Sequence, residues 1–178
     1  MVMIGGNSRD SGKTTMACRI INKLSNSNEI IGLKVTSIRP DEADLHGNHT
    51  EDASSIFNII EELDPGSHKD TSKMLHAGAT RVYYIRVADS CLEEAILYFL
   101  KNYVKNQIIV CESRSLREIV VPGLYLMMMR LPAPIKAKDV SMFLSKADKV
   151  FYFGEDQSET IQYAANLVFL KEKFIVNQ

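Results

Sequence analysis

The stretch Gly5-Gly-Asn-Ser-Arg-Asp-Ser-Gly-Lys-Thr-Thr15 decides how this sequence is interpreted. Asn7–Thr14 matches the phosphate-loop pattern G-x-x-x-x-G-K-[ST] at every fixed position except the first, where Asn7 follows Gly6. In such a loop the backbone N–H groups turn inward toward phosphate oxygens, and Gly12 lets the main chain approach them. Asparagine is among the few residues that readily adopt positive φ, so we expect it to replace the first glycine.

The side chains of the loop have separate expected roles. Lys13 would reach the β and γ phosphates, and Thr14 would offer its hydroxyl to a Mg²⁺ ion. A helix beginning at Thr14 would direct the positive end of its dipole at the anion. The predicted nucleotide-binding set is the run Asn7, Ser8, Arg9, Asp10, Ser11, Gly12, Lys13, Thr14 and Thr15.

The segments around the loop have the pattern of an α/β protein. Met1–Gly5 is a short apolar run, Thr14–Leu24 has apolar residues at intervals of three and four, and Glu29–Thr36 is rich in β-branched residues. Strand, helix and strand within ~35 residues form a βαβ unit, which implies a parallel sheet. The alternative, a threonine-capped helix start without a ligand, fits this context less well.

The rest of the chain continues this alternation. The polar stretch Ser37–Asn48 is expected to be a functional loop. We predict a single domain over residues 1–178 with an α/β fold, a doubly wound, mostly parallel sheet with helices on both faces, as in P-loop NTPases. Further helices are expected at Glu51–Leu63, Thr71–His76, Leu92–Val104, Val140–Leu144 and Ser158–Leu167, and further strands at Arg81–Val87, Gln107–Cys111, Leu124–Met129, Val150–Phe153 and, at a sheet edge, Phe174–Val176.

Three charged residues outside the loop are candidates for the chemistry. Glu112 follows an apolar strand at the carboxyl edge of the sheet, so it is predicted to hold Mg²⁺; a solvated strand-end glutamate is the alternative. Lys34 could contact the γ phosphate or an anionic substrate, and Asp41 could orient water or a metal ion, but both also fit a charged surface. The predicted catalytic residues are Lys13, Lys34 and Asp41, and the predicted metal ligands are Thr14 and Glu112.

Composition limits the partners. The chain has 178 residues, and its 21 basic residues face 22 acidic ones, so we expect no nucleic-acid partner. The three cysteines are widely spaced and form no CxxC pair, which suits a reducing compartment. Because no signal peptide or membrane span is apparent, we expect a cytoplasmic protein without a membrane partner.

Five stretches, in the same order along the chain, resemble the MobB family. These P-loop proteins are linked to making the guanine dinucleotide form of molybdenum cofactor, in a wider class that includes dethiobiotin synthetase. The stretches are Ser11-Gly-Lys-Thr-Thr15, Leu33-Lys-Val-Thr36, Asp70-Thr-Ser-Lys-Met-Leu-His-Ala-Gly-Ala79, Ile109-Val-Cys-Glu-Ser113 and Ala147-Asp-Lys-Val-Phe151.

The resemblance implies a protein that binds ATP or GTP with Mg²⁺, hydrolyses it slowly and assists molybdenum-cofactor or related cofactor biosynthesis. A biosynthetic enzyme and a second copy of the chain are the implied partners. The chain departs from the family at Ser37–Asp41 and at Glu112-Ser-Arg-Ser, so the nucleotide and Mg²⁺ sites carry over better than the molybdopterin role. The base is left open. A small-molecule kinase or ATP-dependent ligase, and a non-catalytic nucleotide-binding interaction module, are the alternatives.

Overall fold

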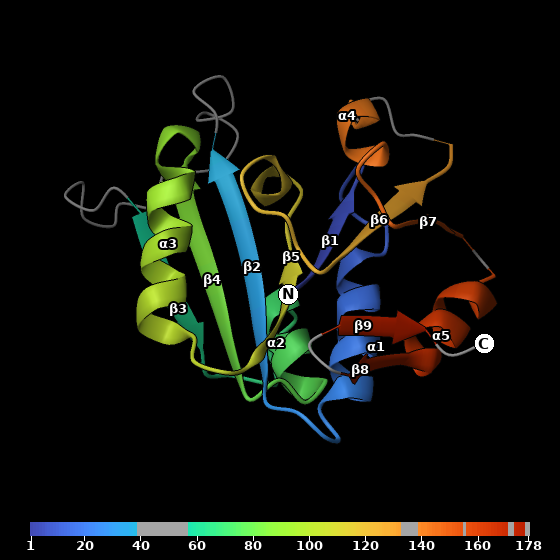
Figure 1. Ribbon diagram of the computed structural model, residues 1–178, viewed down its shortest axis with the longest axis horizontal. Coiled ribbons are helices and arrows are strands. Elements are labelled where there is room, and N and C mark those ends of the chain that lie inside the picture. The colour runs from blue at the N-terminus through green and yellow to red at the C-terminus, as the bar shows by residue number, and fades with distance from the viewer. Residues whose placement is uncertain (39–56, 133–138, 155, 171–172, 177–178) are drawn as a thin grey trace.

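The apolar runs of the sequence form one seven-stranded sheet in the order β3-β4-β2-β5-β1-β6-β7 (Figure 1). The computed structural model describes residues 1–38, 57–132, 139–154, 156–170 and 173–176. All neighbouring strands are parallel except the antiparallel pair β3 and β4. The strands are β1 (Val2–Gly6), β2 (Ile30–Ile38), β3 (Phe57–Glu62), β4 (Arg81–Ala88), β5 (Ile108–Glu112), β6 (Leu124–Arg130) and β7 (Lys149–Phe153).

Helices cover both faces of this sheet. Successive side chains of a strand point to opposite faces, so Val2 and Ile4 of β1 join one apolar cluster and Met3 joins the other. The first cluster lies under α1 (Lys13–Leu24), α2 (Asp70–His76), α5 (Ser158–Asn166) and a small antiparallel sheet of β8 (Leu167–Leu170) and β9 (Lys173–Val176). The second lies under α3 (Leu92–Tyr103), α4 (Ser141–Leu144) and the 3-10 turn η3 (Ser115–Glu118), while a second 3-10 turn, η2 (Asp89–Cys91), leads into α3.

The predicted α/β architecture with a mostly parallel sheet is confirmed, but two elements differ from prediction. The helix expected at Glu51–Leu63 is wrong: residues 57–62 form strand β3, and residues 51–56 lie outside the described part. Phe174–Val176 is a strand, but it pairs with β8 and not with the edge of the main sheet. Of the expected loop Ser37–Asn48, the first two residues belong to β2 and the rest are outside the described residues.

In the sheet, β1 and β5 are neighbours, and the connections that follow them run to opposite faces. From β1 the chain passes into α1 on one face of the sheet, and from β5 it passes into η3 on the other. In open α/β sheets, ligands bind at the carboxyl ends of strands where the connections diverge in this way. The phosphate-loop sequence and Glu112 both lie at this place.

No helix in the described part of the chain combines the length and the apolar character that crossing a membrane requires. The two longest, α1 and α3, have 12 residues each, whereas a spanning helix needs about 20.

Candidate functional site

The backbone is tightly packed at the two glycines that flank the loop between β1 and α1. Gly12 is the N-cap of α1 with φ of 88°, and a Cβ added there would lie 2.2 Å from the ring of Phe153. A Cβ at Gly6 would lie 2.4 Å from the hydroxyl of Ser11. Gly12 therefore meets both a conformational and a steric requirement, as expected where a backbone turns back on itself.

Asn7 occupies the first glycine position for a reason other than the one predicted. Among the described non-glycine residues, Asp10 is the one with positive φ, at 56°, so Asn7 does not use that conformation. Instead its amide pairs with the backbone of Arg130 at the end of β6: the Arg130 N–H donates to Oδ1 at 3.0 Å, and Nδ2 donates to the Arg130 carbonyl at 3.1 Å. The side chain of Asn7 thus ties the loop to the neighbouring strand.

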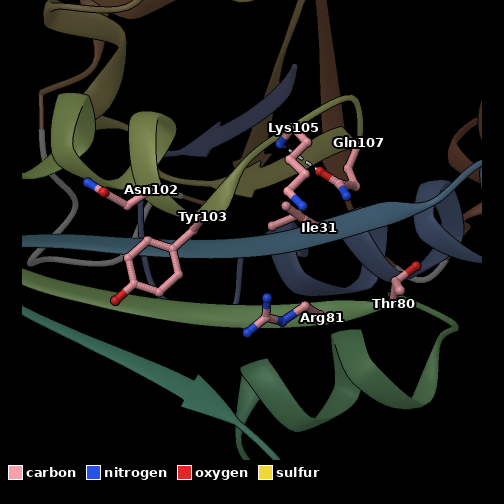
Figure 2. Close-up of a pocket in the computed structure, with 7 residues that line it drawn as sticks. All are labelled: Ile31, Thr80, Arg81, Asn102, Tyr103, Lys105 and Gln107. Carbon is pink, nitrogen blue, oxygen red and sulfur yellow. Dashed lines mark hydrogen bonds between the residues drawn. The ribbon is translucent and has the colours of Figure 1, made fainter.

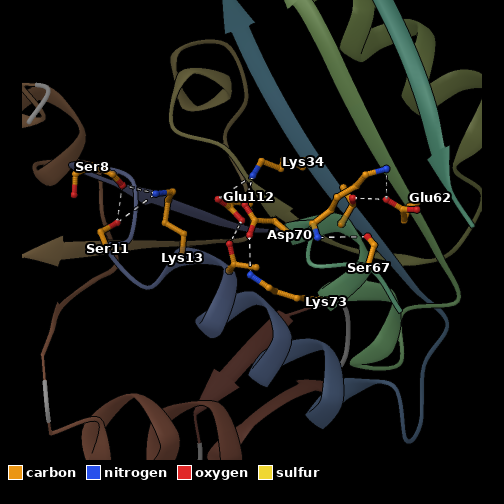
Figure 3. A network of polar contacts seen from close by, with 12 residues as sticks. Ser8, Ser11, Lys13, Lys34, Glu62, Ser67, Asp70, Lys73 and Glu112 are labelled. Atoms are coloured by element: carbon orange, nitrogen blue, oxygen red, sulfur yellow. Dashed lines mark hydrogen bonds and ion pairs between the residues drawn. The ribbon is translucent and has the colours of Figure 1, made fainter. Parts of the chain in front are cut away.

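Lys13 lies folded across its own loop. Its ammonium donates to the carbonyl of Ser8 at 2.6 Å and to the hydroxyl of Ser11 at 3.3 Å, and Figure 3 shows these three residues together. Burial lowers the pKa of Lys13, the carboxylate of Glu112 opposes this, and the ammonium of Lys34 adds to the lowering. Lys13 is therefore a cation partly withdrawn from water, which strengthens its attraction for an anion.

Thr14 and Glu112, the two predicted metal ligands, contact each other directly. Thr14 Oγ1 donates to Glu112 Oε2 at 2.7 Å across 98 positions of the chain. Glu112 is 6% exposed, because it ends β5 between β1 and β2, where its backbone partners are Ile4 and Lys34. A hydroxyl and a carboxylate oxygen are thus held together at the start of α1.

Lys34 joins Glu112 to a second carboxylate. Its ammonium forms an ion pair with Asp70 and lies 3.9 Å from Glu112 Oε1. Burial by itself would lower the pKa of Lys34, but Glu112 and Asp70 outweigh it and raise the pKa. Lys73 lies 3.4 Å from the other oxygen of Asp70. Burial would raise the pKa of Asp70, but its contacts with the two lysines hold it below its usual 3.8.

The other predicted site residues differ in how far they are buried. Ser11 is buried and Ser8 half-buried, and both take part in the lysine contacts described above. The predicted binding residues Arg9, Asp10 and Thr15 are exposed, and Thr15 belongs to α1. Asp41, predicted to be catalytic, lies outside the described residues.

Sequence reasoning missed Asp70 and Phe153 as site residues. Asp70 is the first residue of α2 and reaches Lys34 because this short helix packs between α1 and the strands β2 and β4. The sequence does show an acidic residue at the start of a predicted helix. It does not show which strand that helix packs against. Phe153 ends β7, and the sequence has no pattern that places a β7 side chain against Gly12.

The oxygens of Thr14 and Glu112 fit a Mg²⁺ ion that is shared with phosphate. Mg²⁺ prefers oxygen ligands and usually takes only one or two of them from protein side chains, with water and phosphate supplying the rest. The described residues contain no group of three or more His, Cys, Asp and Glu side chains arranged to hold a metal ion by themselves. Thr14 and Glu112 would supply only part of the octahedral ligand set that Mg²⁺ takes.

A cavity of about 170 Å³ lies at the opposite edge of the sheet, at the starts of β2 and β4 and the end of α3 (Figure 2). Two of its polar side chains bond to carboxylates outside the lining: Arg81 donates to Glu61 at 2.7 and 2.8 Å, and Gln107 donates to Glu29 at 3.1 Å. It is separate from the phosphate loop. Its lining is Ile31, Thr80, Arg81, Asn102, Tyr103, Lys105 and Gln107.

Comparison of the chain with protein-family models, with curated proteins and with solved structures finds no match. The fold and the site therefore define the protein only as far as class: an α/β protein with a mostly parallel seven-stranded sheet and a cluster of lysines and carboxylates at the carboxyl end of β1.

Proposed function

We propose that this protein is a P-loop nucleotide-binding protein that takes ATP or GTP with Mg²⁺ at the loop after β1 and hydrolyses it slowly. The observation that carries the proposal is the 2.7 Å hydrogen bond between Thr14 and Glu112, at the point where the connections from β1 and β5 diverge. A doubly wound P-loop fold accounts for this pairing, because it sets a carboxylate-bearing strand beside the strand that leads into the loop.

Two features of the site favour an anion such as a polyphosphate. The N-terminus of α1 opens directly from the loop, and its first turn contains no acidic residue that would oppose a phosphate. Lys13 supplies a positive charge on a side chain that needs only to leave the carbonyl of Ser8 to reach a ligand in the loop. Helix dipole and ammonium therefore act on the same ligand.

Thr14 and Glu112 would hold the Mg²⁺ ion. When bound, the ion would neutralise phosphate charge and favour departure of the leaving phosphate. Glu112 would serve it as a charged ligand, and Thr14, already oriented by Glu112, as a neutral one. Lys34 pairs with Glu112 and Asp70 and would add a positive charge near a bound γ phosphate.

The biological setting follows from the resemblance of Ser11–Thr15, Asp70–Ala79 and the other three stretches to the MobB family. We propose an accessory role in molybdenum-cofactor or related cofactor biosynthesis, with a biosynthetic enzyme as partner and a cytoplasmic location. Catalysis of hydrolysis would involve Lys13 and Lys34, with Asp41 as a further candidate.

A kinase or ligase that transfers to a small acceptor is the second candidate. Lys34 and Thr36 point to the same face of the sheet, and their partners in register on β4 are Tyr84 and Arg86. All four side chains are half-buried, so polar groups continue along the sheet from the phosphate site. An acceptor bound along this row would lie beside the γ phosphate.

The test is a calorimetric titration of the protein with ATP, GTP, ADP and GDP, each with and without Mg²⁺, followed by measurement of phosphate release. We expect micromolar binding of at least one triphosphate, tighter with Mg²⁺, and slow release of phosphate without any acceptor. Release only when an acceptor is added would favour the kinase or ligase, and binding without release would favour a non-catalytic module. Absence of binding by all four nucleotides would refute the proposal.

A further inference from the structure

We infer that Asn7 is a positioning residue, which holds the phosphate loop in its binding conformation by fastening it to the end of β6. This inference rests on the proposed function for its consequence, nucleotide affinity, but the fastening itself is independent of any ligand. Asn7 is 2% exposed, and both polar atoms of its amide are bonded to Arg130 at 3.0 and 3.1 Å.

The contact extends the sheet into the loop. In the β1 to β6 ladder, Gly6 is the last residue in register, opposite Met128. Asn7 then donates its backbone N–H to the Met128 carbonyl at 3.4 Å, and its side chain takes over the donor and acceptor of Arg130. An amide side chain can do this because its carbonyl oxygen accepts and its NH₂ group donates, as the C=O and N–H of a peptide group do.

Asn7 is next to the residue whose carbonyl accepts the hydrogen bond from Lys13. Ser8 follows Asn7 directly, and its carbonyl accepts both the ammonium of Lys13 and the hydroxyl of Ser11. The hydroxyl of Ser8 also donates to Asn7 Oδ1 at 3.3 Å. The position of Asn7 therefore determines the position of the Ser8 carbonyl. That carbonyl in turn determines where the Lys13 ammonium lies in the ligand-free loop.

A glycine at position 7 would restore the usual phosphate-loop pattern but would carry no amide to bond with Arg130. It would also gain backbone freedom in the ligand-free loop, which binding would have to remove. We therefore expect Asn7→Gly to bind nucleotide about tenfold more weakly than the parent, although its sequence matches the pattern better. Tenfold corresponds to about 1.4 kcal/mol.

The matched control is Asn28→Gly. Asn28, like Asn7, donates its amide to a backbone carbonyl, that of Leu24 at 2.9 Å, but it is only half-buried and lies beyond the other end of α1. We expect it to lower the melting temperature without changing nucleotide affinity. A loss of affinity in Asn7→Gly alone separates positioning of the loop from a general loss of stability.

The experiment measures two quantities on the parent, Asn7→Gly and Asn28→Gly. The first is amide hydrogen exchange of residues 8–12 without ligand, which Asn7→Gly should accelerate and Asn28→Gly should not. The second is the affinity for ADP and for ATP, each with Mg²⁺, by calorimetry. If amide hydrogen exchange is unchanged in Asn7→Gly, Asn7 does not fasten the loop to β6. If exchange is faster but nucleotide affinity is unchanged, Asn7 does not position the loop for binding.

Failure of the proposed function has a different signature. If the parent binds no nucleotide while hydrogen exchange in the loop still responds to Asn7→Gly, the proposed nucleotide binding is wrong. The positioning role of Asn7 is then wrong too, and only its fastening of the loop is supported. If the parent binds nucleotide and Asn7→Gly binds it equally well, the function stands and the inference about Asn7 is overturned.

Discussion

Replacing Glu112 by glutamine separates the metal contribution of this side chain from its structural one. Glutamine preserves the shape and an oxygen that accepts from Thr14 at 2.7 Å, but it removes the negative charge. The attraction between Glu112 and the Lys34 ammonium at 3.9 Å is about 4 kcal/mol at an effective dielectric constant of 20. Lys34 is a quarter exposed and retains Asp70 as a partner, so we expect a loss of roughly 1–2 kcal/mol in unfolding free energy.

Nucleotide binding should change in opposite directions with and without the metal. Without Mg²⁺, Glu112 repels the phosphates, so glutamine should leave the affinity unchanged or strengthen it. With Mg²⁺, the loss of a charged ligand should reduce the gain in affinity that the metal provides by at least about tenfold, or about 1.4 kcal/mol. Calorimetric titration of ATP into both proteins, at zero and at saturating Mg²⁺, measures both effects.

Glu93→Gln, an exposed position in the first turn of α3, is the control for loss of one negative charge far from the loop. It should leave the effect of Mg²⁺ on affinity unchanged. If Glu112→Gln weakened binding equally with and without Mg²⁺, Glu112 would be a structural strand-end residue and the metal assignment would be wrong.

Three further predictions concern the loop and its neighbours. Lys13→Ala should reduce nucleotide affinity about 10- to 100-fold, the worth of a hydrogen bond to a charged group, while circular dichroism shows an intact fold; parental affinity would count against the phosphate-loop assignment. Gly12→Ala should lower the unfolding free energy by about 2–4 kcal/mol in urea denaturation, because alanine is strained at φ of 88° and its Cβ meets Phe153; adding Phe153→Leu should recover part of the loss, and a neutral Gly12→Ala would contradict the packing described. Asp70→Asn should cost roughly 1 kcal/mol at neutral pH. Since the folded pKa of Asp70 lies below its usual 3.8, this difference should persist down to about pH 4 and shrink below it; a difference that stays constant from pH 7 to pH 2 would show that the charge is not its source.

The sequence predicted those parts of the candidate site that depend on residues close together in the chain. Residues 7–15 are consecutive, so their type and spacing predict a phosphate loop without knowledge of the fold. Thr14 and Glu112 could be paired in advance because Glu112 directly follows one apolar run, Thr14 lies at the end of the loop after another, and parallel strands end at the same edge of a sheet. The pairing needed only that β1 and β5 be neighbours.

The parts that were not predicted depend on packing between distant segments. In the run over residues 51–63, Phe57, Ile60 and Leu63 recur at helical spacing, yet β4 supplies a ladder along which residues 57–62 pair as an edge strand. Asn7 meets Arg130 across 123 positions, and Lys34 meets Asp70 across 36. Such contacts are set by the order of strands and by how helices dock on them, which periodicity does not contain.

The contact between α1 and α5 has a consequence for how the protein is made. Arg19, on the outer side of α1, donates to Thr160 and to Gln157, which lie 141 and 138 positions later in the chain. The apolar face of α1 is likewise closed by Ala164 and Leu167. During synthesis the loop after β1 leaves the ribosome early, but the side of α1 that packs against α5 and β8 remains uncovered until these residues have emerged. The packing around α1 can therefore be completed only after translation has passed β8.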